Sequence, residues 1–294
     1  MPGRQEPAAK AAGSCRPGGR ILGPGAAGLA GRAALFPGAF TAVPIPFLRQ
    51  LTAVSRTPQA NRRLAYFLTF TAGAVNAGGF LAVQQYTSHM SGIVSLMADH
   101  MALGGVAVVL QGLAALLSFV AGAATSASLI NFGRRSHLAS EFALPLLFEA
   151  LLLLVFGLLG ANLETLRWFY VPGTVMLLCY IMGLQNAMIT KVSKSEIRTT
   201  HVTGMVTDIG IELGKLFYWN VARLDAADTP PVRADRGKLI VLSAMVTLFF
   251  TGGVTGAYSF FHYGFGSTVP LALFLMVLAA VPVADDIRGF FSRL

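Results

Sequence analysis

Long apolar runs separated by short polar segments make up most of this chain after residue 60. An α-helix needs about 20 predominantly apolar residues to cross a bilayer, and six of the runs are close to that length or longer. They cover residues 64–83, 106–130, 142–161, 168–189, 239–261 and 267–284. The pattern therefore predicts an all-α integral membrane protein with about six transmembrane helices.

Two shorter segments, residues 93–103 and 202–216, carry apolar residues at helical spacing on one face only. In the second segment, Asp208, Glu212 and Lys215 fall on the polar face, where we expect a solvated surface with ordinary helical ion pairs. We predict that each segment forms a short amphipathic or re-entrant helix that follows a spanning helix.

The same short motif precedes both of these segments. The order hydroxyl, hydroxyl, His, apolar, hydroxyl, Gly occurs at residues 87–92 and again at residues 199–204. Each copy follows a Gly-x-x-Asn-Ala sequence, at 73–77 and at 183–187. So many matched positions in the same order predict an internal repeat.

The two repeats cover residues from about 62 to 161 and from about 167 to 288. Each contains three predicted spans, and an odd number of crossings gives the repeats opposite orientations in the membrane. The first motif then lies at the outer end of its span and the second at the inner end. Inverted repeats of this kind recur in secondary transporters, which bind their solute near the midplane between the repeats.

Charged residues are scarce and unevenly distributed. They make up 12% of the chain, against about 25% in soluble domains. Residues 1–61 are rich in Gly, Pro, Arg and Ala and strongly basic, and we predict a disordered extension there, with an organelle transit peptide as the alternative. Residues 62–294 form the predicted membrane domain. No nucleic-acid-binding motif accompanies the basic extension, so its expected partner is the lipid bilayer.

Basic residues also predict the orientation of the spans, because they accumulate in cytoplasmic loops. In the six-span arrangement, the N-terminal extension, Arg134-Arg135, residues 191–238 and Arg288 share one side, whereas Arg167 lies on the other. We therefore expect both termini to be cytoplasmic.

The two motifs predict a solute site. His89 and His201 occupy matched positions next to helix starts, where free backbone N–H groups and the helix dipole favour an anion or a carboxylate. The predicted solute-binding residues are Thr87, Ser88, His89, Ser91, Thr199, Thr200, His201, Thr203, Asn76 and Asn186. The alternative is structural, because Ser and Thr hydroxyls cap helices without any ligand. Capping alone, however, does not require the same histidine in both repeats.

Glu149 lies near the middle of the third predicted span, where an ionisable side chain is costly and therefore a candidate for proton coupling. The alternative is a neutral glutamic acid that is hydrogen-bonded to a neighbouring helix. The spacing of His and Cys residues predicts no metal site, and nothing in the chain indicates a cofactor. Catalytic motifs such as G-x-S-x-G and H-E-x-x-H are missing, so we do not expect an enzyme.

Three segments resemble the YoaK-like family of uncharacterised bacterial membrane proteins. They are GLQNAM at 183–188, IRTTHVTGMVTDIGIELG at 197–214 and SHMSG at 88–92. The resemblance covers residues from about 62 to 290 and implies a multi-pass protein of the bacterial inner (plasma) membrane with about six spans. It implies no known substrate.

These patterns together favour a transporter or permease for a small solute, which could be anionic. The alternative is a non-transporting membrane scaffold or sensor whose amphipathic segments lie flat at the interface. Either protein could form a homo-oligomer.

Overall fold

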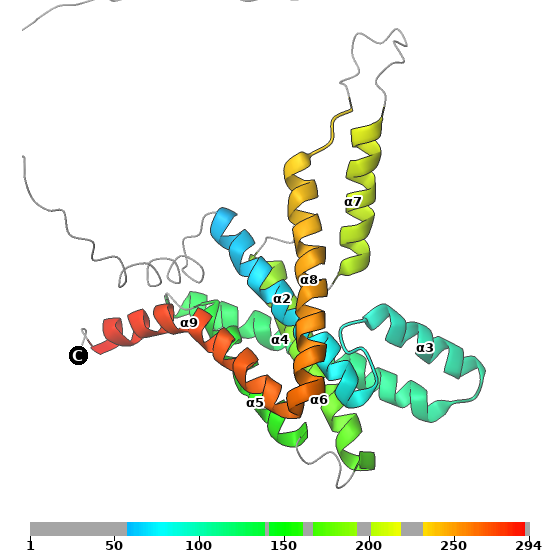
Figure 1. The fold of residues 1–294 in the computed structure, drawn as a ribbon. Helices are drawn as coiled ribbons and strands as arrows, with labels where there is room; N and C mark the ends of the chain where they lie inside the picture. Colours follow the sequence, from blue (N-terminus) through cyan, green and yellow to red (C-terminus); the bar gives the residue numbers. More distant parts are fainter. Residues whose placement is uncertain (1–57, 139–140, 161–166, 193–200, 219–231, 292–294) are drawn as a thin grey trace, which may run out of the picture. The chain divides into compact units, whose positions relative to one another are not determined.

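The computed structural model describes residues 58–138, 141–160, 167–192, 201–218 and 232–291, and every regular element in them is helical (Figure 1). The elements are α2 (Pro58–Val83), α3 (Met90–Ala102), α4 (Val106–Arg135), α5 (Ala143–Gly160), α6 (Arg167–Val192), α7 (Val202–Phe217), α8 (Arg236–Tyr263), the 3-10 helix η1 (Gly264–Ser267) and α9 (Thr268–Phe291). Each predicted span corresponds to one of α2, α4, α5, α6, α8 and α9.

The predicted N-terminal extension lies mostly outside the described residues. Its last four positions, 58–61, belong to the first turn of α2, which begins at a proline. Proline suits the start of a helix because its backbone nitrogen has no hydrogen to leave unpaired.

Five segments are long and apolar enough to cross a membrane, namely Gln59–Val83, Val106–Arg135, Ala143–Gly160, Val171–Lys191 and Arg236–Arg288. The fifth has 53 residues, which is about twice the length that the hydrocarbon core requires. It contains all of α8, which has 28 residues, and all but the last three residues of α9. The chain turns between them at Gly264, whose φ of +57° suits glycine. The apolar helices thus indicate a multi-helix membrane protein.

The long helices pack in pairs that are distant in sequence. Helix α2 packs on α8, α4 packs on α6, and α5 packs on α9. The side chains of Leu146, Leu153 and Phe156 in α5 are fully or almost fully buried in a core that also includes Met182 of α6 and Leu275 of α9.

Glycines bring the first two pairs of helices into close contact. Gly73 of α2 lies against the backbone carbonyl of Phe249 in α8, and Gly183 of α6 lies against the backbone carbonyl of Phe119 in α4. A Cβ atom at either glycine would overlap that carbonyl. Small residues permit such backbone approaches between membrane helices.

The partner helices contribute glycines to the same crossings. Gly252 of α8 lies against the carbonyl oxygen of Phe70, and Gly122 of α4 lies against that of Tyr180. The α2–α8 and α6–α4 crossings are therefore built in the same way, from glycines at matched positions in the two halves of the chain.

Helices α3 and α7 are half-length helices, each packed against the long helix that follows it. They have 13 and 16 residues, so at about 1.5 Å per residue neither is as long as the roughly 30 Å hydrocarbon core. Ile93 and Met97 of α3 lie beside Gly112 in the first half of α4. Figure 1 shows α7 beside the first half of α8, where Lys238 pairs with Asp208 at 3.2 Å.

The expectation that the polar face of residues 202–216 is solvated is wrong for Glu212. This side chain is 3% exposed and pairs with Lys215 at 2.9 Å, and its second carboxylate oxygen accepts the backbone N–H of Asp235 at 2.8 Å. The packed side of α7 thus includes Glu212 together with the buried Met205, while other apolar residues such as Val206 and Leu216 are exposed. The expected helical ion pair is confirmed for Glu212 and Lys215, whereas Asp208 pairs with Lys238 of α8.

Candidate functional site

A cavity of about 960 Å³ lies where the two half-length helices begin. Its walls come from α2, α4, α6 and α8, the segment before α3, and the first residues of α3 and α7. Seven of the predicted site residues line it, namely Asn76, Ser88, His89, Ser91, Asn186, His201 and Thr203. Two motifs that are 112 positions apart in the chain therefore meet at one cavity.

The cavity lies at the middle of the long helices. Phe119 of α4 and Phe249 of α8 line it. Each lies closer to the midpoint of its helix than any other residue of that helix that lines the cavity. Helices of 30 and 28 residues are long enough to cross a bilayer completely. The cavity therefore lies halfway along two helices that are each long enough to span a bilayer.

Each histidine occupies the N-cap position of its half-length helix. His89 has φ −94° and ψ 72°, and His201 has φ −84° and ψ 57°, and neither side chain makes a capping hydrogen bond. The hydroxyl-capping alternative is therefore wrong for these two N-cap positions, because the residue at the cap is a histidine. Both imidazoles are exposed and line the cavity, and the first-turn N–H groups beside them have no partner within their own helix.

A glycine three residues further on makes room for each imidazole. A Cβ atom at Gly92 would lie 2.9 Å from Nδ1 of His89, and one at Gly204 would overlap the ring of His201. The His-x-x-Gly spacing common to both motifs therefore has a steric cause, because the ring folds back over the first turn of its own helix.

The remaining polar residues of the motifs differ in their environment. Asn76 is 9% exposed and its Oδ1 accepts a hydrogen bond of 2.8 Å from the Ser88 hydroxyl. The Nδ2 amide of Asn186 donates to the carbonyl of Met182 at 2.8 Å. Thr87 is fully buried and is not among the cavity-lining residues. Thr199 and Thr200 lie outside the described residues.

Glu149 is not brought to the cavity. It is fully buried in α5, and its Oε1 accepts a hydrogen bond of 2.8 Å from Nε2 of Gln185 in α6. Among the described residues, its other oxygen and the Gln185 carbonyl have no hydrogen-bond partner. The alternative of a neutral glutamic acid predicts such a hydrogen bond to a neighbouring helix. A role of Glu149 in proton coupling stays a prediction.

Sequence reasoning missed the aromatic part of the cavity and the partner of Glu149. Phe119 and Phe249 each stand three residues before a crossing glycine, Gly122 and Gly252, so aligning the glycines would have matched them. Gln185 could have been noticed as a polar residue inside an apolar run.

The described lining of the cavity contains no Asp, Glu, Lys or Arg side chain. Its polar groups are imidazoles, amides, hydroxyls and the free N–H groups at two helix starts, whose dipoles make them partially positive. No group of three or more His, Cys, Asp or Glu that could hold a metal ion occurs within the described ranges. The arrangement suits a neutral or negatively charged ligand.

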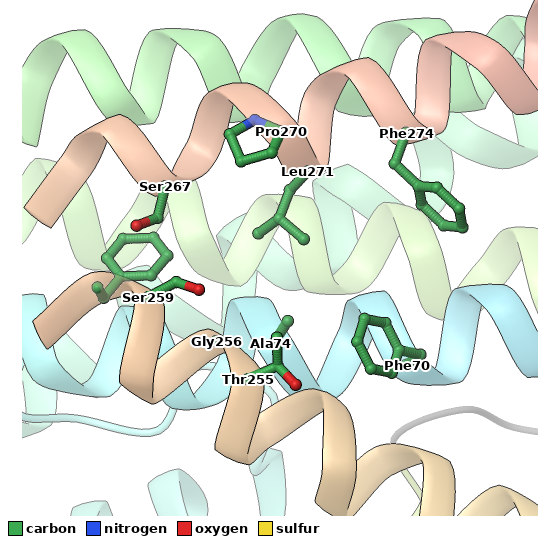
Figure 2. A pocket seen from close by; sticks show the side chains of 10 residues that line it. Phe70, Ala74, Thr255, Gly256, Ser259, Ser267, Pro270, Leu271 and Phe274 are labelled. Atoms are coloured by element: carbon green, nitrogen blue, oxygen red, sulfur yellow. The ribbon is translucent and has the colours of Figure 1, made fainter. Parts of the chain in front are cut away.

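A second, smaller cavity of about 220 Å³ lies between α2, α8 and the start of α9 (Figure 2). Figure 2 shows Phe70 and Ala74 on one wall, facing Leu271 and Phe274. The Ser267 side chain lines it, is 4% exposed and has no hydrogen-bond partner within the described part of the chain. None of the predicted site residues lies here.

A protein-family model described as "Protein of unknown function (DUF1275)" matches residues 64–281. The match confirms the resemblance to the YoaK-like family. No curated protein and no solved structure matches the chain.

Proposed function

The chain belongs to the DUF1275 family of proteins of unknown function, and from the geometry of its cavity we propose that it is a transporter or permease for a small solute rather than an enzyme. One observation carries the proposal. The two His motifs, one from each half of the chain, line a single cavity halfway along α4 and α8. A solute site at mid-membrane between two repeats is the arrangement of many secondary transporters.

The matched helix contacts support the two inverted three-helix repeats. In the proposed alignment α2, α3, α4 and α5 correspond to α6, α7, α8 and α9. Under this alignment, the contact between α2 and α8 is equivalent to the contact between α6 and α4, and both contacts are made through matched glycines. The packing of α3 on α4 is likewise equivalent to the packing of α7 on α8. Six crossings follow if α8 and α9 each span the membrane.

The proposed setting is the bacterial inner membrane, with both termini cytoplasmic. Arg134 and Arg135 end α4, and Lys191 lies at the end of α6. In the six-crossing arrangement these two ends share the side of the basic N-terminal extension, as the positive-inside rule requires.

The cavity histidines provide the first test. Purified protein in proteoliposomes is assayed for uptake of labelled carboxylates, amino acids and sugars. We expect at least one solute to accumulate above empty liposomes, and His89→Ala and His201→Ala each to lower that uptake by about tenfold or more, the effect of losing a hydrogen bond to a charged group. His262→Ala, at the exposed end of α8, is the matched control.

The result that would contradict the proposal is specific. If His89→Ala and His201→Ala elute as folded protein from size exclusion and retain full uptake, the cavity is not the solute site. If no solute crosses and His201→Gln is tolerated in cells, a scaffold or sensor is the better description.

Glu149 is the proposed proton carrier. Glu149→Gln keeps a neutral side chain of the same size that can still bond with Gln185, so we expect folded protein whose uptake no longer depends on a proton gradient. The measurement is uptake with and without an imposed gradient. A variant that responds to the gradient as the natural protein does would exclude this role for Glu149.

A further inference from the structure

We propose that the solute of the cavity is an organic carboxylate with a flat apolar body. The carboxylate binds at the starts of α3 and α7, beside His89 and His201, and the body lies against Phe119 and Phe249. This inference rests on the proposed function, because it names the class of solute for the same cavity.

Hydrogen-bond donors gather at the starts of the two half-length helices. Neither His89 nor His201 caps its helix with its side chain, and the first-turn N–H groups of an α-helix have no partner within the helix. Oriented N–H groups and the positive end of a helix dipole are a common means of binding carboxylates and phosphates. Two such ends at one cavity strengthen the preference for negative charge.

Asn76 independently indicates a ligand. It lines the cavity with 9% of its surface exposed, and only its Oδ1 is bonded, to Ser88. No hydrogen bond from the amide nitrogen is found within the described residues, and this nitrogen is not one of the buried unpaired atoms, so it is accessible from the cavity. A carboxylate oxygen would satisfy this donor.

The described lining of the cavity consists of uncharged polar, apolar and imidazole side chains. A cation or the ammonium group of a zwitterion would be desolvated without a carboxylate partner, which is costly. Phosphate and sulfate are usually held by Arg or Lys, and the described lining offers neither. A singly charged carboxylate needs only hydrogen-bond donors.

Aromatic side chains from both long helices provide a surface for the remainder of the ligand. Phe119 and Phe249 come from matched positions on α4 and α8, and Met90 and Tyr86 add further apolar surface. Aromatic rings prefer to pack against other flat groups in offset or edge-to-face geometry. The cavity of about 960 Å³ lies at the upper end of the usual range for small-molecule sites, which leaves space for a ring and its hydrating water.

The test compares the binding of six small compounds to the full-length protein in detergent. Benzoate and phenylacetate are the carboxylates with a ring, benzamide and benzylamine are their neutral and cationic counterparts, and acetate and phosphate lack the ring. Dissociation constants come from ligand titrations of the melting temperature. We expect benzoate or phenylacetate to bind about tenfold or more tightly than every other compound.

A pair of neighbouring phenylalanines gives the matched control. Phe249→Ala removes the ring from the cavity, whereas Phe250 is 69% exposed and does not line it. Phe249→Ala should weaken binding of the aryl carboxylate by about tenfold, and Phe250→Ala should leave it unchanged. The backbone carbonyl of residue 249 still contacts Gly73 in the variant, so the helix crossing is retained.

Three outcomes would overturn the proposed ligand class: no shift with either aryl carboxylate, equal binding of benzamide or benzylamine, or Phe249→Ala behaving like Phe250→Ala. Proteoliposome flux separates this failure from failure of the permease. Binding of benzoate without flux would contradict transport and leave the ligand class standing. Flux of a sugar or an amine instead would contradict the ligand class and leave transport standing.

Discussion

At the scale of single residues, the recurring feature is an imidazole folded over a glycine. His89 lies over Gly92 and His201 lies over Gly204, so in each half the glycine determines where the ring sits. Ring position matters because the donors of the proposed site have to converge on one ligand.

Gly204→Ala tests this arrangement. The added methyl group overlaps the ring of His201, so the ring must move, and we expect uptake to fall by about tenfold, as for loss of the hydrogen bond itself. Folding should not suffer, because alanine is better than glycine in a helix by up to about 1 kcal/mol. The melting temperature and uptake are measured on the same preparation.

The matched control lies in the same helix. A Cβ atom at Gly210 meets nothing within 4 Å, so Gly210→Ala should equal or exceed the natural melting temperature and keep full uptake. Normal uptake by Gly204→Ala would show that the position of the His201 ring is unimportant.

At the scale of elements, the two half-length helices are attached to their long partners by different chemistry. Helix α7 is attached to α8 by the ion pair between Asp208 and Lys238 and by the hydrogen bond that the Asp235 backbone N–H donates to Glu212, whose carboxylate also pairs with Lys215 of α7. The position in α3 that matches Glu212 is His100, which lies beside Gly105 at the start of α4. The stability of the contact between α7 and α8 should therefore depend on pH, because the carboxylates that make it must be ionised.

The hydrogen bond from Lys215, with a further one from the backbone N–H of Asp235, holds the pKa of the Glu212 carboxyl below its ordinary value. A lowered pKa in the folded state means that the ionised carboxylate contributes stability above the unfolded pKa of about 4.3. This contribution is lost as the pH falls from there through the folded pKa.

Glu212→Gln should accordingly lower the melting temperature at pH 7, and the difference from the natural protein should be smaller at about pH 3, below the ordinary glutamate pKa of about 4.3. Melting curves in detergent at both pH values give the comparison. Asp208→Asn is the control, because its pair with Lys238 is about two-fifths exposed and exposed pairs contribute little. An equal deficit of Glu212→Gln at both pH values would contradict the ion-pair explanation.

At the scale of the whole molecule, the open question is whether the two halves are inverted. Ser91 and Thr203 line the same cavity, so cysteines at these positions report on the opening of the cavity. The far ends of the half-length helices are better reporters of topology. Leu103 follows α3 and is 80% exposed, and Tyr218 follows α7 and is 55% exposed.

We expect Leu103→Cys to be labelled by an impermeant thiol reagent from the periplasmic side and Tyr218→Cys from the cytoplasmic side. The background carries Cys15→Ser and Cys179→Ala, which leaves no other thiol. Intact cells and inverted membrane vesicles provide the two sides. Labelling of both positions from the same side would mean that the halves are parallel, and the inverted repeat would be wrong.

Much of the fold could be predicted from local pattern alone. The apolar runs located α2, α4, α5, α6, α8 and α9, and helical spacing located α3 and α7 to within a few residues. These features are local because hydrophobic length and periodicity are properties of one segment in its solvent. Matched motifs also identified seven residues of one cavity before any contact was known.

Only the tertiary structure decided how those segments meet. The burial of Glu212, the pairing of Glu149 with Gln185 and the place of Phe119 and Phe249 in the cavity all depend on which helices cross and at which residue. In lipid, apolar side chains are stable facing either the membrane or a neighbouring helix. Hydropathy therefore determined which segments are long apolar helices, and the close approach at glycines determined which side chains face one another.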